Sequence, residues 1–301
     1  MKPITRATTV LLVATIAAVG CSKKSATSET KTDARGVPAT LEQSVDFTKA
    51  TPIGEDDVVA DAKLAGPVTF TDGEAAFQAK KYGDAMAIFE RYTEQRPKNV
   101  WGHYMLGLSA WKSGDPKKAE QGFEAALAID PAHVKSLVNL SRLFIEQKRT
   151  DEAIARLTAA AEIDPESMVV YRLLGRTYDA QGKTDEAITA YSRAIELNDL
   201  DAWSMNNLGL LLLKTQRFEE ALPLFTKAVD VRPSVPSFHN NLGMALEHTG
   251  RFRAAATAYS DALAADPSYA KAKKNLARVE AVRKTEPEQD GEIAVNETAG
   301  K

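Results

Sequence analysis

The sequence predicts an all-α solenoid of about six helix pairs, and three observations support this prediction. First, prolines recur on one period of 34 residues, with Asp199 in the single vacant slot. They are Pro97, Pro131, Pro165, Pro233 and Pro267. Second, small residues recur in the same register, at Gly73, Gly107, Ser141, Gly175, Gly209, Gly243 and Ala277. Third, good helix formers dominate and β-branched runs are scarce beyond the N-terminus. A fixed period of this length indicates a repeat array.

Each repeat is predicted to contain two short amphipathic helices, and residues 202–233 are its clearest copy. We number the repeat so that Leu208 and Gly209 are positions 7 and 8. Position 20 is then alanine throughout, at Ala85, Ala119, Ala153, Ala187, Ala221 and Ala255. Position 24 is large, at Phe89, Phe123, Leu157, Tyr191, Phe225 and Tyr259. We expect the small residues to let paired helices approach closely and the large ones to fill the remaining space.

This pattern resembles the tetratricopeptide repeat (TPR) family over about 215 residues. The resemblance implies a right-handed superhelical solenoid over residues 68–284, with about six TPR helix pairs and a C-terminal capping helix over 270–284. The first repeat departs most from the pattern, with Asp72 where leucine is expected. Thr71 and Glu74 predict a capping box at its start. The acidic, aperiodic segment 285–301 is predicted to be disordered.

The N-terminus has the features of a secretion signal. Lys2 and Arg6 precede an apolar run over residues 10–19, which suits a signal peptide better than a membrane span. Cys21, the single cysteine, follows Gly20 in a segment that resembles the lipobox of bacterial lipoproteins. The resemblance implies that residues 1–20 are removed and that Cys21 is lipidated. The alternative is a plain signal peptide in which Cys21 has no role.

The lipoprotein resemblance also implies a location. Ser22 follows the cysteine, with no aspartate there to indicate inner-membrane retention. We therefore expect a lipid-anchored protein of the bacterial cell envelope, at the outer membrane and facing the periplasm. Residues 21–67 have poor hydrophobic periodicity and solvated charges, and are predicted to be a disordered tether between the anchor and the array.

Composition and motifs argue against two classes of function. Lysine and arginine number 38 against 41 aspartates and glutamates, a net charge of −3, so nucleic acid is not expected as a partner. No HExxH, P-loop, GxSxG or CxxC pattern occurs, so we expect neither an enzyme, nor a metal site, nor a cofactor. His103 and His239 both occupy position 4, which is a packing position, and a structural role is predicted for both.

Asparagine recurs at position 6, interrupted only by Leu173. The four residues are Asn139, Asn207, Asn241 and Asn275. The TPR resemblance implies that such asparagines line the concave surface and hold the backbone of an extended peptide. An amide can do this because it offers both a donor and an acceptor. The alternative is that they bond to neighbouring helices and stabilise stacking, since asparagine inside a helix needs some local partner.

Basic side chains are predicted to surround these asparagines on the first helix of each repeat. The peptide-binding candidates among them are Arg142, Arg172, Arg176 and Lys214, and the same set includes Lys135, Lys271, Lys274 and Arg278. Acids are fewer: Glu146, Asp179 and Glu247. The aromatic residues of the set are Trp101, Tyr104, Trp111 and Trp203. A basic groove in a mildly acidic protein indicates an acidic or carboxylate-bearing peptide partner. Ordinary solvated charges and packed aromatic rings are the alternatives.

These observations predict a membrane-anchored scaffold that binds peptide segments of other envelope proteins in a concave groove. The chain is similar to pilotin lipoproteins, which deliver the secretins of type IV pili, and to adaptor lipoproteins that gather cell-wall hydrolases. No residue above separates these two versions. A hypothesis of another class is an enzyme without a known motif, or a glycan-binding module that uses the aromatic residues of the second repeat.

Overall fold

The computed structural model describes residues 66–285, and this part of the chain consists of α-helices without strands. The helices are α1 (Phe70–Gln78), α2 (Tyr82–Gln95), α3 (Val100–Lys112), α4 (Pro116–Ile129), α5 (Val134–Glu146), α6 (Thr150–Ile163), α7 (Met168–Ala180), α8 (Thr184–Leu197), α9 (Ala202–Lys214), α10 (Phe218–Val231), α11 (Pro236–His248), α12 (Phe252–Ala265) and α13 (Ala270–Thr285). The predicted signal peptide, Cys21, nearly all of the tether and the tail beyond Thr285 lie outside the described residues.

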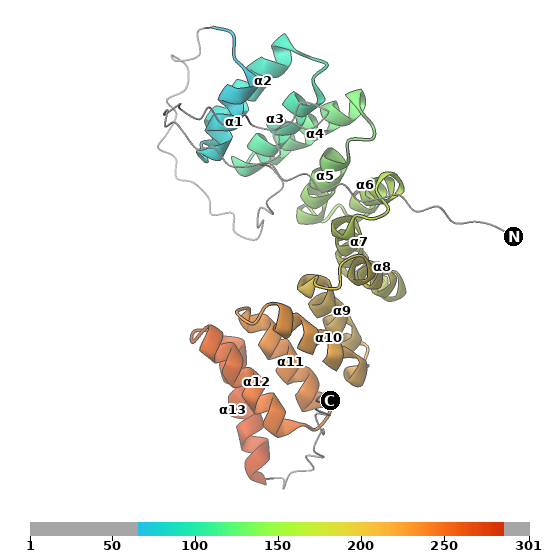
Figure 1. Ribbon diagram of the computed structural model, residues 1–301, viewed down its shortest axis with the longest axis vertical. Coiled ribbons are helices and arrows are strands. Elements are labelled where there is room, and N and C mark those ends of the chain that lie inside the picture. Colours follow the sequence, from blue (N-terminus) through green and yellow to red (C-terminus); the bar gives the residue numbers. More distant parts are fainter. Residues whose placement is uncertain (1–65, 286–301) are drawn as a thin grey trace, which may run out of the picture. The chain divides into compact units, whose positions relative to one another are not determined.

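Consecutive helices pack in antiparallel pairs, so that each odd-numbered helix opens a repeat and the next even-numbered helix closes it (Figure 1). The odd-numbered helices of successive repeats also contact one another, from α3 with α5 through to α11 with α13. No two successive even-numbered helices in the described range pack to a comparable extent. The fold is therefore an all-α superhelical repeat array, with the odd-numbered helices on its inner side.

The two helices of a repeat meet where a glycine faces an aromatic ring. A Cβ atom added to Gly209 would lie 2.7 Å from the ring of Phe225, much closer than such atoms approach in proteins. The same close contact occurs in four more repeats, between Gly73 and Phe89, Gly107 and Phe123, Gly175 and Tyr191, and Gly243 and Tyr259. In the remaining repeat, Ser141 occupies position 8 and the smaller Leu157 occupies position 24. A Cβ atom at position 8 therefore accompanies a smaller side chain at position 24.

Alanine at positions 20 and 27 completes the close approach of the helices. Ala119, Ala187 and Ala221 at position 20 are fully buried, as are Ala126 and Ala228 at position 27. Packing at this density leaves little room for additional atoms, which explains the repeated small residues. The capping helix α13 buries Ala272 and Val279 against the last repeat and exposes its lysines. This arrangement confirms the predicted cap.

The start of α1 differs from the sequence prediction. The capping box is formed by Thr69 and Asp72 and not by Thr71 and Glu74. The Thr69 hydroxyl accepts a hydrogen bond from the Asp72 amide at 3.2 Å, and the Asp72 carboxylate accepts one from the Thr69 amide at 2.8 Å. The reason is packing, because the ring of Phe70 lies edge-on to Phe89 and requires helical backbone to begin at that residue.

Replacing Gly209 with alanine is expected to lower the stability of the array by about 1–3 kcal/mol, because the new Cβ atom would overlap the Phe225 ring. Gly83→Ala is the matched control, since nothing lies within 4 Å of its Cβ position in α2. We expect it to be neutral or slightly stabilising. The double variant Gly209→Ala/Phe225→Leu should recover part of the loss, by analogy with Ser141 and Leu157. Thermal and urea unfolding followed by circular dichroism measure all three, and an unchanged midpoint for Gly209→Ala contradicts the packing argument.

Candidate functional site

The candidate site is formed by the sides of the odd-numbered helices that face away from their even-numbered partners. Positions 4, 7, 8 and 11 of these helices contact the partner, so positions 2, 9 and 13 point to the opposite side. On the central helices α5, α7 and α9 this surface, here called the inner face, is formed by Lys135, Arg142, Glu146, Val169, Arg176, Ala180, Trp203, Leu210 and Lys214. Most of these side chains are exposed, and the inner face is therefore accessible to a partner.

Three arginines lie close together on α5 and α7. Burial lowers the pKa of Arg142, and the neighbouring charges of Arg172 and Arg176 lower it further. The Arg172 guanidinium donates to a carboxylate oxygen of Asp201 at 2.7 Å, and that carboxylate is almost completely buried. Arg176 is exposed and forms no ion pair with any residue between 66 and 285. Within this arginine cluster of Arg142, Arg172 and Arg176, the exposed Arg176 is therefore the cation most accessible to a ligand.

Three of the four predicted asparagines bond to the preceding repeat. The amide nitrogen of Asn139 donates to the Tyr104 hydroxyl at 3.0 Å. In the same way Asn241 donates to Asn206 Oδ1 at 2.8 Å, and Asn275 donates to Asn240 Oδ1 at 3.0 Å. In each pair the partner lies 35 residues earlier, one position beyond the repeat period. These bonds join the odd-numbered helices side by side. Peptide contact by the same amides stays a prediction.

Asn207 differs from the other three asparagines. The residue 35 positions before it is Arg172, which is engaged with Asp201. Asn207 remains half-exposed between α7 and α9, where it accepts a bond of 3.4 Å from the Asn206 side chain. The Tyr191 hydroxyl, whose pKa is raised chiefly by burial, is a neighbour of Asn207. Of the four, Asn207 therefore offers both accessibility and a central place beside the arginine cluster.

Ion pairs and hydrogen bonds also connect neighbouring repeats across the inner side. Lys214 lies 3.2 Å from an oxygen of Asp179, and Trp111 donates to Glu146 at 2.9 Å. At the C-terminal end, Arg278 binds Glu247 through two hydrogen bonds of 2.7 and 2.8 Å. The exposed pair of Lys214 and Asp179 contributes little to stability, because solvent screens it. Lys214 therefore remains accessible to a ligand.

The predicted aromatic residues are placed in different environments. Tyr104 is buried between repeats and belongs to the core, which corrects its expected place on the groove surface. Trp101 is half-buried, with the Lys135 ammonium 5.0 Å from its ring centre. Trp203 is 41% exposed and Leu210 is 38% exposed, and both lie on the inner side of α9. These two residues form the apolar part of the inner face.

The two histidines at position 4 have the structural role that the sequence predicts. His103 Nε2 donates to the carbonyl oxygen of Pro97 at 2.9 Å. His239 Nε2 donates to that of Pro233 at 2.7 Å. Each bond fixes the turn from the previous repeat to the start of an odd-numbered helix. Neither histidine therefore has its Nε2 available for a ligand.

Sequence reasoning missed the polar partners that support the inner face. Asp201 accepts from both Arg172 and Ser204, the latter at 2.5 Å, although it had no apparent role in the repeat pattern. Asn206 and Asn240 were likewise not selected. A search for polar pairs spaced by 35 residues, one more than the period, would have found the asparagine pairs.

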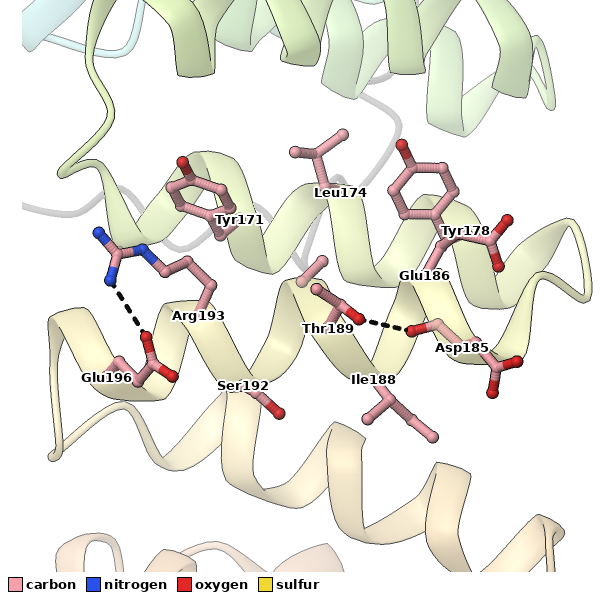
Figure 2. A pocket seen from close by; sticks show the side chains of 11 residues that line it. Tyr171, Leu174, Tyr178, Asp185, Glu186, Ile188, Thr189, Ser192, Arg193 and Glu196 are labelled. Atoms are coloured by element: carbon pink, nitrogen blue, oxygen red, sulfur yellow. Dashed lines mark hydrogen bonds and ion pairs between the residues drawn. The ribbon is translucent and has the colours of Figure 1, made fainter.

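A hollow of about 850 Å³ lies between α7 and α8 (Figure 2). Tyr171, Leu174 and Tyr178 of α7 line one side, and Ile188 and Arg193 of α8 contribute to the other. The Arg193 guanidinium lies 5.9 Å from the Tyr171 ring centre. The repeat pattern does not predict this hollow, because positions 4, 7 and 11 are packing positions in the repeat.

Two other kinds of feature are absent from residues 66–285. No helix in this range is both long and apolar enough to cross a membrane. Likewise, no group of three or more histidine, aspartate or glutamate side chains is arranged there to hold a metal ion.

Comparison with known proteins places this geometry in a family. A family model described as the C-terminal TPR domain of cilia and flagella-associated protein 70 matches residues 32–300. The chain belongs to this TPR family. A comparison with curated protein sequences finds no match. The TPR array therefore has the fold typical of non-catalytic protein-interaction scaffolds.

Solved TPR structures support the assignment of the fold. PilF of Pseudomonas aeruginosa is 20% identical with a TM-score of 0.61, and the match covers 69% of this chain and 95% of PilF. YrrB, described as a TPR protein with an unusual peptide-binding site, is 17% identical with a TM-score of 0.52, over 62% of this chain and 96% of YrrB. MamA of Desulfovibrio magneticus RS-1 is 20% identical with a TM-score of 0.52, over 55% and 93%. At these identities the likeness shows the fold alone.

Replacing Asn241 with alanine is expected to lower stability by about 1–3 kcal/mol, because the Asn206 oxygen would lose its donor at a buried contact between repeats. Asn207→Ala should cost less than about 1 kcal/mol, since its side chain is half-exposed. Urea unfolding of both variants checks this difference. Equal losses would show that burial does not separate the roles of these two asparagines.

Stability should also fall at alkaline pH. Burial raises the pKa of Tyr104 from 10 to about 12, which the hydrogen bond from Asn139 reduces only in part. The protonated form is therefore favoured in the folded chain, and its contribution is present below pH 10 and is lost between pH 10 and about 12. The rise corresponds to roughly 3 kcal/mol. Tyr104→Phe should show a smaller loss of unfolding free energy across this range than the parent chain. An identical pH profile contradicts the assignment.

Proposed function

We propose that the TPR array is a membrane-anchored scaffold that binds peptide segments of other envelope proteins on its inner face. One observation carries this proposal: Arg176, Trp203 and Leu210 are exposed together on odd-numbered helices whose other faces are packed. Exposed aromatic and arginine side chains on a rigid support are typical of protein-binding surfaces.

The asparagine side chains that join the repeats can also form hydrogen bonds with a bound peptide. A side-chain amide carries two donor hydrogens and a carbonyl oxygen with two lone pairs. Asn275, which is half-exposed, uses one donor for the preceding repeat, so further hydrogen-bonding capacity is left. The peptide-binding site described for YrrB, a protein of the same fold, supports this use of the array.

The anchor is the second part of the proposal. Lipidation of Cys21 would hold the chain at the outer membrane, and residues 21–67 would be the tether that carries the array into the periplasm. Two versions of the role share these parts. In the first, the array acts as a pilotin for a secretin of a type IV pilus. In the second, it gathers cell-wall hydrolases.

Affinity capture of the full-length lipidated chain from detergent-solubilised envelope tests the proposal. We expect the parent chain to retain specific proteins and Arg176→Glu to lose most of them, since the charge change lies on the inner face. Lys117→Glu makes the same charge change on the exposed start of α4 and is the matched control. Co-purification of a secretin favours the pilotin version, and that of hydrolases favours the adaptor version. Equal capture by all three chains contradicts binding at the inner face.

The intact mass of the captured chain tests the anchor independently. The expected mass is that of a chain beginning at Cys21 with acyl groups attached. The mass of a cleaved chain without acyl groups would overturn the anchor and leave the scaffold role standing. Turnover of a cell-wall substrate by the purified chain, abolished by one substitution on the inner face, would replace the scaffold with an enzyme.

A further inference from the structure

The helix that closes the array, α13, is strongly basic. It contains six basic residues and one acid, Glu280, whereas the whole chain has a net charge of −3. Two of the six are paired within the fold, since Arg278 binds Glu247 and Arg283 binds Glu280. The other four are exposed and form no ion pair with any residue between 66 and 285: Lys271, Lys273, Lys274 and Lys284. One end of the array therefore carries a group of free cations.

Most of these lysines lie on the side of α13 that points away from the array, here called the outward side. The fully buried residues Ala272 and Val279 mark the side that packs against the last repeat. At 3.6 residues per turn, the opposite side is formed by residues that are three, four or seven positions apart. They are Lys273, Lys274, Ala277, Ala281 and Lys284, and all are exposed. The outward side is thus a surface of lysine and alanine without an acid or a large apolar residue.

The outward side of α13 is not adapted to packing against another helix. Position 4 carries a buried side chain in the preceding repeats, for example Leu137, Met205 and His239. In α13 the same position is the exposed Lys273, and position 8 is the exposed Ala277. Covering a lysine with an apolar helix would remove its charge from water, which is costly. The outward side is therefore suited to a charged surface and not to a further helix of the repeat type.

Solubility alone does not account for this composition. Soluble surfaces usually mix charges of both signs, as this chain does overall with 38 basic and 41 acidic residues. Protein-binding surfaces usually have aromatic or large apolar side chains at their centre, and the outward side of α13 has only alanine there. Lysines separated by small residues instead fit an extended layer of negative charge, such as the phosphate groups of a membrane surface.

We propose that α13 is a second membrane contact, which binds the phosphate groups of anionic lipids through Lys273, Lys274 and Lys284. The inference rests on the proposed function, because the lipid anchor would hold α13 near this membrane. A flexible tether over residues 21–67 has a root-mean-square span of about 35–40 Å, so it would not keep the array away from the membrane surface. The array would then be attached at both ends, through the anchor at Cys21 and through α13.

Lysine acetylation of the full lipidated chain, measured at each residue by mass spectrometry, tests this contact. The chain is reconstituted into phosphatidylcholine vesicles with or without phosphatidylglycerol, so that the anchor is the same and only the lipid charge differs. We expect Lys273, Lys274 and Lys284 to react at least about threefold more slowly in the anionic vesicles, because the headgroups cover them. The exposed Lys117 and Lys148 are internal controls and should react equally in both kinds of vesicle.

Salt and a double variant show whether charge is the cause of the protection. About 1 M salt shortens the screening length to about 3 Å and should remove the protection. Lys273→Gln/Lys284→Gln should remove the protection of Lys274, and Lys117→Gln/Lys148→Gln should leave it unchanged. All four replaced side chains are exposed, so the melting midpoints should not change. Protection of Lys274 that persists in the Lys273→Gln/Lys284→Gln chain would contradict the proposed contact.

Other occupants of the outward side give different results. Equal reaction rates in the two kinds of vesicle would overturn the membrane contact. Protection in detergent without lipid would assign the outward side to the acidic segment 286–301 or to a second copy of the chain. Protection that appears only after solubilised envelope proteins are added would assign it to a protein. Each of these three results contradicts the proposal.

The intact mass separates this inference from the proposed function. If the chain is acylated and its lysines react equally in both kinds of vesicle, the contact through α13 is wrong and the anchor stands. If the chain is not acylated, the anchor is wrong, and the soluble chain is sedimented with the same vesicles. Binding to anionic but not to neutral vesicles, weakened by Lys273→Gln/Lys284→Gln, would then support the contact through α13 alone. Absence of binding to both would reject the two proposals together.

Discussion

The array depends on the contact between a glycine at position 8 and an aromatic ring at position 24 within each helix pair. The ring of Phe225 occupies the space that a Cβ atom of Gly209 would need, and four other repeats have the same contact. Because this contact holds the two helices of a repeat close together, each pair packs as a rigid unit with its odd-numbered helix on the inner side. Ser141 and Leu157 show that the constraint is on their combined size rather than on glycine itself.

Hydrogen bonds between repeats then determine how neighbouring helix pairs pack against each other. The bonds from Asn139 to Tyr104 and from Asn241 to Asn206 link neighbouring odd-numbered helices at buried positions, where a wrong register would leave polar groups unpaired. Between α7 and α9, the hydrogen bond from Arg172 to Asp201 makes the corresponding link. The side chains of the inner face are therefore positioned by packed helices and not by flexible loops, which lowers the entropy lost when a ligand binds.

Much of the fold could be predicted from the sequence, because the signal that defines it is repeated. The period, the helix pairs, the cap and the structural role of His103 and His239 all follow from residues that recur in one register. Features that occur in only one repeat could not be predicted in this way. The start of α1 shifted to Thr69 because Phe70 packs on Phe89, a contact that no other repeat predicts.

The candidate site could be predicted in outline but not in its division of roles. The sequence selected the asparagines and arginines, yet periodicity alone cannot say whether an amide points to a neighbouring helix or to solvent. The structure separates the buried Asn241 from the half-exposed Asn207, and the engaged Arg172 from the exposed Arg176. Trp203 became the central aromatic residue because the others are more buried, which depends on neighbours far from it in the sequence.

Site-specific photo-crosslinking in the intact envelope tests the central claim most directly. A photoreactive amino acid in place of Leu210 lies on the inner face, and one in place of Ser192 lies at the hollow between α7 and α8. The account predicts that irradiation joins an envelope protein to the chain through position 210 and not through position 192. Crosslinks from position 192 alone would place the partner at the hollow instead of the inner face and would contradict the account.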